Sequence, residues 1–164
     1  MGRTKDFLGI VAEATREALP GVSERYNARI LTSEAEVYMA RRLAAATFVR
    51  LGALDVDEVD ACGVPHHDPW LGRSVYFGTF DRQHDNELAV TGRLIWSPEA
   101  GVVATRLPVE QIDAAHAQRL LQLQPGKTAE IGSLVKRSSI ATEQVAVLKL
   151  IRRMWQFAAD KRIE

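Results

Sequence analysis

The sequence predicts one three-layer (α/β) domain of the α+β class, in which a mixed, mostly antiparallel central sheet is flanked by helices. Its 164 residues, 46% apolar and 26% charged, have the size and balance of a single globular domain with a core. Strand-like and helix-like patterns alternate along the chain from residue 26 onward, which is typical of helices that pack on a sheet. Two neighbouring strand patterns, at 74–81 and 87–96, are joined by a short polar turn, so they should pair antiparallel.

The chain is expected to begin with a short helix that precedes the main domain. From Thr4 to Leu19 apolar side chains recur at helical spacing, and the Pro-Gly pair that follows ends the pattern. "YNARIL", residues 26–31, is then a plausible strand. We therefore divide the chain into an N-terminal helix with its lead-in, residues 1–25, and one main domain, residues 26–164.

A second helix is expected over 33–51, and a long loop after it. Ser33 and Glu36 have the spacing of a capping box, in which each side chain accepts a hydrogen bond from the other residue's backbone, and Gly52 ends the pattern. Residues 53–73 mix Pro, Gly and acidic residues without sustained periodicity. A loop of this length in a compact domain is often functional.

The C-terminal half predicts a helix, a strand and a final helix. Apolar spacing from Pro108 to Leu123 indicates the first helix. A strand is expected over 128–137, in the same sheet as the hairpin, and a helix over 142–162 with Thr142 as its cap.

Charge and composition disfavour several classes of function. Lys plus Arg and Asp plus Glu both total 21, so the zero net charge favours neither nucleic acid nor an anionic membrane as a partner. The N-terminus lacks a long uncharged run, which argues against a signal peptide or an integral membrane segment, and the single Cys62 suits a cytoplasmic protein. Adjacent His66 and His67 should point opposite ways, and His84 and His116 lack a ligand spacing, so no metal site is predicted.

One acid, Glu130, stands in a strand that should lie in the middle of the sheet. An unpaired charge there is costly, so either the register exposes Glu130 or its charge has a function. A structural alternative is an ion pair between Glu130 and Arg93, which lies among apolar residues of the hairpin. Farther along, Lys136 and Arg137 precede the start of a helix, where phosphate can bind, although both could equally be solvated at a strand end.

Taken together, the order of elements resembles the GNAT-type N-acyltransferase fold. "DPWLGRSVYFGTFDRQHDNELAVTGRLIW" (68–96) and "AEIGSLV" (129–135) are similar to segments of acyl-homoserine-lactone synthases and long-chain N-acyl amino acid synthases. The resemblance covers about residues 26–162, and it implies transfer of an acyl group from a thioester, on coenzyme A or an acyl carrier protein, to a small-molecule amine. The thioester would bind in a V-shaped split after the strand at 128–137. The family fold continues into further strands, so the far wall of this cleft should be missing, supplied by a partner chain, or lost by truncation at the C-terminus.

The resemblance also implies roles for individual residues. Glu130 and Arg93 would be the catalytic residues, with Glu130 as the base that accepts the proton of the amine, directly or through a water. Four further residues would bind the acceptor substrate: Asp68, Trp70, Phe48 and Ser133. Seven residues on the same strand and at the following helix start would bind the acyl donor: Leu134, Val135, Lys136, Arg137, Ser138, Ser139 and Thr142.

The sequence departs from the family pattern at two positions. Ala44 stands where the family usually has an arginine, four residues before the aromatic at Phe48, and Ser133 stands where the strand motif usually has another arginine. These losses favour an N-acyl amino acid or another amide over a homoserine lactone as the product. The expected co-substrate is an acyl-CoA or an acyl-acyl-carrier-protein, with no metal; an acyl carrier protein is a candidate partner, and a homodimer is left open. The alternatives are a catalytically degenerate binding or assembly module, and an ordinary acetyltransferase, which the lack of a glycine-rich loop disfavours.

Overall fold

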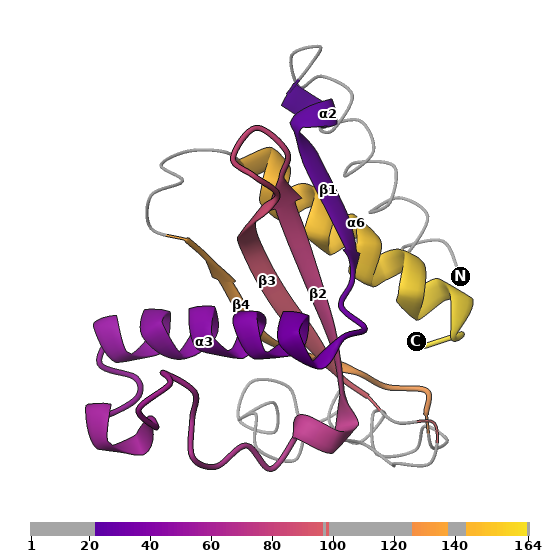
Figure 1. Ribbon diagram of the computed structural model, residues 1–164. Helices are drawn as coiled ribbons and strands as arrows, with labels where there is room; N and C mark the ends of the chain where they lie inside the picture. The colour runs from indigo at the N-terminus through magenta and orange to yellow at the C-terminus, as the bar shows by residue number, and fades with distance from the viewer. Residues whose placement is uncertain (1–21, 97, 99–125, 138–143, 164) are drawn as a thin grey trace.

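The computed structural model describes residues 22–96, 98, 126–137 and 144–163, and Figure 1 shows how they are arranged. The helices expected at 4–19 and 108–123 lie outside these residues. Two short 3-10 turns are labelled η. The elements in chain order are α2 (Val22–Arg25), β1 (Tyr26–Ile30), α3 (Glu34–Arg50), η1 (Val56–Glu58), η2 (Leu71–Arg73), β2 (Ser74–Asp81), β3 (Glu87–Ile95), β4 (Glu130–Lys136) and α6 (Gln144–Asp160).

The four strands form one sheet in the order β1-β2-β3-β4, and each pairing is antiparallel. The predicted hairpin of β2 and β3 is therefore confirmed. So is the prediction that the later strand, β4, belongs to the same, mostly antiparallel sheet. Among the described strands we find no parallel pairing of the kind that a mixed sheet contains. The register places Tyr76 of β2 opposite Arg93 of β3, and Arg93 opposite Gly132 of β4, so these three positions cross the sheet in one row.

The two long helices cover opposite faces of the sheet, as Figure 1 shows. The α6 face holds the larger core, in which Phe77, Val90 and Leu94 pack against Leu150 and Met154 of the helix, among others. The α3 face has a smaller cluster: Leu31, Ala40, Tyr76, Phe80 and Leu88. Because the α3 face carries fewer large apolar side chains, it leaves space between the helix and the sheet.

Local sequence signals explain where the elements begin and end. Ser33 caps α3: its hydroxyl accepts a hydrogen bond from the backbone of Glu36, and the Glu36 carboxylate accepts one from Ser33, which confirms the capping box. Gly52 has φ +69°, a left-handed conformation that suits glycine after a helix. The strands and α3 match the predicted bounds to within two residues, as is usual at fraying ends. The helix α6 ends two residues before its predicted end, and its predicted start at 142 lies outside the described residues.

Strand β4 contains a bulge that the sequence did not reveal. Thr91 pairs with Val135 and Arg93 with Gly132, so three steps on β4 face two steps on β3. Ser133 and Leu134 together face Gly92, and Ser133 has φ +54°, in the left-handed region. A bulge bends its strand and changes the direction of side chains, and this one lies beside the space under α3.

The segment 53–73 is a loop, as predicted, with more local order than its composition suggested. Besides η1 and η2 it contains an isolated antiparallel bridge between Val59 and Pro65. The carboxylate of Asp60 accepts hydrogen bonds from the backbone of Cys62 and Val64, at 2.9 and 3.0 Å, which closes a tight turn. Tyr38 and Arg41 of α3 donate hydrogen bonds to the carbonyl oxygens of Cys62 and Pro65, which join the loop to the helix.

Candidate functional site

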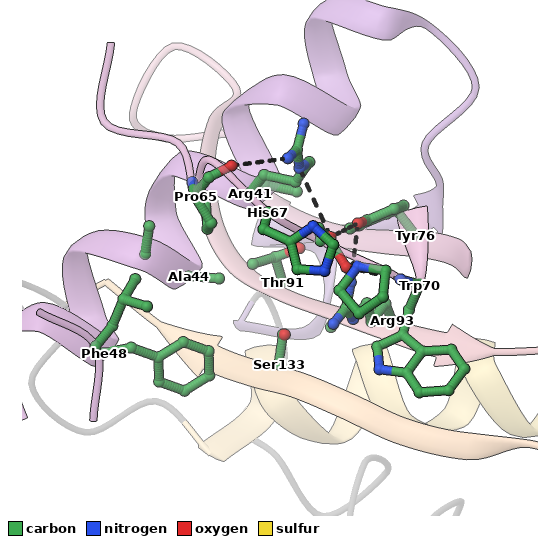
Figure 2. A pocket seen from close by; sticks show the side chains of 16 residues that line it. Arg41, Ala44, Phe48, Pro65, His67, Trp70, Tyr76, Thr91, Arg93 and Ser133 are labelled. Carbon is green, nitrogen blue, oxygen red and sulfur yellow. Dashed lines mark hydrogen bonds and ion pairs between the residues drawn. The ribbon is translucent and has the colours of Figure 1, made fainter. Parts of the chain in front are cut away.

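A cavity of about 190 Å³ lies between α3, the end of the 53–73 loop and the sheet. For scale, a cavity of roughly 150 Å³ can hold a benzene molecule. Figure 2 shows the side chains that line it. They come from three sheet strands as well as the helix and the loop: Ala40, Arg41, Ala44, Ala45, Phe48, Leu54, Pro65, His67, Asp68, Pro69, Trp70, Tyr76, Thr91, Gly92, Arg93 and Ser133.

An ion pair between Asp68 and Arg93 forms the polar centre of the cavity. One terminal nitrogen of the Arg93 guanidinium, Nη1, donates to both Asp68 oxygens, at 2.7 and 2.9 Å. The Asp68 side chain is 10% exposed and that of Arg93 14% exposed, so the pair is largely removed from water. The hydroxyl of Tyr76 lies 3.3 Å from both an Asp68 oxygen and Nη1 of Arg93. The loop is thus tied to two strands through charged hydrogen bonds.

The protonation states of these groups follow from burial and from their partners. Burial alone would raise the pKa of Asp68, but the hydrogen bond and charge of Arg93, the backbone N–H of Trp70 and the charge of Arg41 together lower it below its usual value. The same pair holds the pKa of Arg93 above its usual value, against the opposing effect of burial. Burial raises the pKa of Tyr76. At neutral pH the cavity therefore contains an ionised Asp68, a charged Arg93 and a protonated Tyr76.

A second guanidinium, that of Arg41 on α3, enters the cavity from the other side. Its Nη2 atom donates a long hydrogen bond of 3.4 Å to the carbonyl oxygen of Pro65. Its Nε atom lies 3.8 Å from an Asp68 oxygen, which is too far for a hydrogen bond. Figure 2 shows Arg41, Ala44 and Phe48 following one another along the helix face above the cavity.

The remaining wall of the cavity is apolar. Ala40, Ala44 and Ala45 are buried and small, and they leave room beneath α3. Leu54 also lines the cavity. Figure 2 shows Phe48 away from the ion pair and Trp70 beside Arg93 at the other end. The cavity thus joins a charged end to an apolar end, an arrangement suited to a ligand with both kinds of group.

The structure brings five of the sequence-predicted site residues into this one cavity: Phe48, Asp68, Trp70, Arg93 and Ser133. They are far apart in the chain and come from α3, the loop, β3 and β4. Ser133 reaches the cavity from the bulge in β4. Ala44, where the family pattern has an arginine, also lines the cavity, so the space that such a side chain would fill is open.

Glu130 is placed differently from these residues. It is the first residue of β4, pairs with Ile95, is partly exposed, and is not among the residues that line the cavity. The structural alternative of an ion pair between Glu130 and Arg93 is wrong, because Arg93 is paired with Asp68 instead. The register explains the difference, since Arg93 lies opposite Gly132 and not opposite Glu130.

The expected donor-binding residues are described only in part. Leu134 is 42% exposed, whereas the side chain of Val135 is buried, so Val135 could meet a ligand only through its backbone. Lys136 is exposed at the end of β4, and Arg137 forms an ion pair with Glu87 of the neighbouring strand. Ser138, Ser139 and Thr142 lie outside the described residues.

Four polar residues of the cavity were not predicted from the sequence to bind substrate: Arg41, His67, Tyr76 and Thr91. Arg41 could have been found from helical periodicity, because it lies seven residues, or two turns, before Phe48 on the same helix face. His67 was considered only as a metal ligand. Tyr76 carries a hydroxyl on an otherwise apolar strand, but its partners become visible only in the folded sheet.

Two further findings concern metals and membranes. Within the described ranges, no three His, Cys, Asp or Glu side chains gather in a way that could hold a metal ion. The described helices include none with the length and apolar character needed to span a bilayer.

Comparisons with known proteins agree with the fold. No protein-family model matches the chain, and no curated protein matches it in sequence. Among solved structures, the chain is similar to FeeM, an N-acyl amino acid synthase from uncultured soil microbes, with a TM-score of 0.55 and 23% sequence identity. The match covers 85% of this chain and 68% of that one. The fold predicted from the sequence is therefore confirmed: the chain shares its fold with this solved N-acyl amino acid synthase.

Proposed function

We propose that this protein is an N-acyltransferase, which transfers an acyl group from a thioester to an amine and yields an N-acyl amide. The observation that carries the proposal is the cavity between α3 and the sheet, where residues matched to the acyltransferase pattern from four separate parts of the chain meet. The structural likeness to an N-acyl amino acid synthase supports the same reaction class. Because a fold alone does not determine function, the roles of individual residues are argued from the chemistry of the cavity.

In the proposed reaction the amine nitrogen attacks the thioester carbonyl carbon, the C–N bond forms and the C–S bond breaks. The amine loses one proton to a base, and the base returns a proton to the leaving sulfur, so the carrier leaves as a thiol. Asp68 is poorly suited to act as this base, because Arg93 keeps its pKa low. We assign to Asp68 and Arg93 the task of shaping the acceptor pocket, together with Phe48 and Trp70.

Glu130 is the proposed proton acceptor. It lies on the same strand as Ser133, three residues before it, and its carboxylate does not form an ion pair with Arg93, which pairs with Asp68. A proton could reach it through a water, since it is partly exposed and does not line the cavity. General-base assistance of this kind contributes ~100-fold or more to a rate.

The donor is proposed to approach along β4. Backbone N–H groups at the bulge would stabilise negative charge on the carbonyl oxygen as the amine attacks. Lys136 and Arg137, at the end of the same strand, would bind the phosphate of coenzyme A or of an acyl carrier protein. The ion pair of Arg137 with Glu87 does not prevent this, because it lies at the surface and such pairs are weak.

Thioester turnover tests the proposal. The purified chain is incubated with acyl-CoA and acyl-acyl-carrier-protein donors of several chain lengths and with a panel of amines, and release of free thiol is measured while mass spectrometry identifies the amide. We expect thiol release that depends on the amine, that falls in Glu130→Gln, and that is unchanged in Glu34→Gln, which alters an exposed acid outside the cavity. Thioester binding without turnover for any donor and amine would instead favour the binding-module alternative.

A further inference from the structure

The cavity has an unbalanced charge. Two arginines, Arg41 and Arg93, line it, against one carboxylate, that of Asp68. Arg93 holds both oxygens of Asp68 at hydrogen-bond distance, whereas Arg41 approaches no closer than 3.8 Å. The carboxylate therefore neutralises mainly Arg93, and one positive charge is left over at the cavity.

Arg41 also has too few hydrogen-bond partners for its environment. A guanidinium has five N–H donors, and that of Arg41 makes one long bond of 3.4 Å, to the carbonyl oxygen of Pro65. Its Nε atom is shielded from solvent and has no hydrogen-bond partner, and the Nε atom of Arg93 is in the same state. The side chain of Arg41 is only 18% exposed. Charged groups that are removed from water are normally fully hydrogen-bonded, so this arrangement is incomplete.

The space beside Arg41 is open. The next turn of α3 places Ala44 and Ala45 against the cavity, and both side chains are small. Figure 2 shows the cavity below Ala44, between Arg41 and Phe48. The family resemblance places an arginine at position 44, where this chain has Ala44. Here the arginine is Arg41, about one turn earlier on α3, so its Cα lies about 5 Å away along the helix axis.

We propose that Arg41 binds the carboxylate of the acceptor, so that the acceptor is an amino acid or a similar amino carboxylate and not an amine that lacks a carboxylate. This inference rests on the proposed function. A carboxylate supplies the one negative charge that the cavity lacks, and its two oxygens suit a guanidinium with several free donors. The apolar wall from Ala44 to Phe48 would then face the side chain or the acyl group.

The donor also carries an anion, its phosphate, but this group fits the cavity less well. A long arm separates that phosphate from the thioester, so the phosphate and the reacting carbonyl could not both lie in a space of about 190 Å³. The acceptor's carboxylate, in contrast, is one or a few bonds from the amine that reacts. If Arg41 binds the acceptor's carboxylate, a change at Arg41 should weaken binding of the acceptor. If it binds the donor's phosphate, the change should weaken binding of the donor.

Binding without the donor provides the first test. Calorimetry with the wild-type chain compares each common amino acid with its carboxamide, which keeps the amine and the side chain but lacks the negative charge. We expect the best-binding amino acid to bind about 10- to 100-fold more tightly than its carboxamide, as a charge-assisted hydrogen bond would give. In Arg41→Gln this preference should disappear, whereas in Arg42→Gln, a change at the neighbouring exposed arginine outside the cavity, it should remain.

Thermal melts of each variant show whether it is folded, and Arg41→Lys serves as a conservative control. The lysine variant keeps the charge and should retain part of the preference. If folded Arg41→Gln binds the acid and the carboxamide as the wild type does, or if the wild type shows no preference, the inference is overturned. It is also overturned if Arg41→Gln raises KM for the donor and leaves KM for the acceptor unchanged, because the anion would then be the donor's phosphate.

The outcomes separate this inference from the proposed function. If the chain forms an amide from an amine that lacks a carboxylate, and Arg41→Gln leaves that rate unchanged, the carboxylate site is refuted but the acyltransferase proposal stands. Carboxylate binding that depends on Arg41, without turnover of any thioester, would support the anion site and defeat the acyltransferase.

Discussion

Replacing Asp68 by Asn should destabilise the fold more than any surface charge change, because it removes the counter-charge of the largely buried Arg93. The Asp68 side chain is 10% exposed and that of Arg93 14% exposed, and two hydrogen bonds of 2.7 and 2.9 Å join them. Removing one partner of such a largely buried pair leaves the other charge uncompensated, which costs roughly 3 kcal/mol. For a chain of this length each kcal/mol lowers Tm by roughly 2–4 °C, so the expected loss is about 6–12 °C.

A matched control comes from a surface pair of the same sheet. Glu87, 52% exposed, pairs with Arg137, and Glu87→Gln should change the free energy of unfolding by about 0.5 kcal/mol or less. Both variants exchange a carboxylate for an amide of nearly the same shape, so their difference isolates the effect of burial. Thermal melts and urea unfolding of the two variants and the wild type provide the measurement.

The pH dependence gives a second check on the same ion pair. The pKa of Asp68 in the folded chain lies below the value of about 3.9 that an unfolded Asp has. The ionised pair therefore contributes its full stability above pH 4 or so, and this contribution is lost as the pH falls through the folded-state pKa. The stability gap between the wild type and Asp68→Asn should be constant near neutral pH and should close in acid. If Asp68→Asn is no less stable than Glu87→Gln at pH 7, the ion pair does not hold the loop and the reasoning is refuted.

Three further predictions concern the donor site, the base and the core. Glu130→Gln should keep Tm within about 2 °C of the wild type, since Arg93 does not depend on it, while the rate of amide formation falls by ~100-fold or more; an undiminished rate per folded molecule would exclude Glu130 as the base. Lys136→Ala combined with Arg137→Ala should weaken coenzyme A or carrier-protein binding by roughly 1 to 3 kcal/mol in calorimetry, and unchanged affinity would place the phosphate elsewhere. Gly78→Ala should cost ~1–3 kcal/mol in urea unfolding, because its new Cβ would lie 2.7 Å from Leu88; a neutral result would show that the α3-side core can move apart.

Much of the fold could be predicted because it depends on signals that are local in the sequence. The capping box at Ser33 and Glu36 defines the start of α3 by itself, since its partners are three residues apart. The hairpin of β2 and β3 follows from two apolar runs and a short polar turn, in which Asp85 and Asn86 adopt the left-handed conformations, φ 49° and 56°, that these residue types tolerate.

The site was predictable only as a set of residues, and the resemblance to acyltransferases supplied that set. Phe48, Asp68, Trp70, Arg93 and Ser133 were singled out and do meet in one cavity. Their contacts were not predictable, because Arg93 could have paired with Glu130 in one strand register or with Asp68 from the loop in another. A shift of one residue turns a strand's side chains to the other face, and periodicity does not reveal which residue of β4 lies opposite Arg93.

The sequence by itself therefore determined the four described strands and the two long helices α3 and α6, and their order, because helix caps, turns and periodicity act over a few residues. Only the tertiary structure decided which charges meet. The bulge at Ser133 set the register of β4, the ordered loop carried Asp68 to Arg93 across 25 positions, and the face of α3 turned Arg41 inward. A charge must be paired when it is removed from water, and which charges are removed depends on the packing of residues that are far apart in the sequence. This packing exists only in the folded chain.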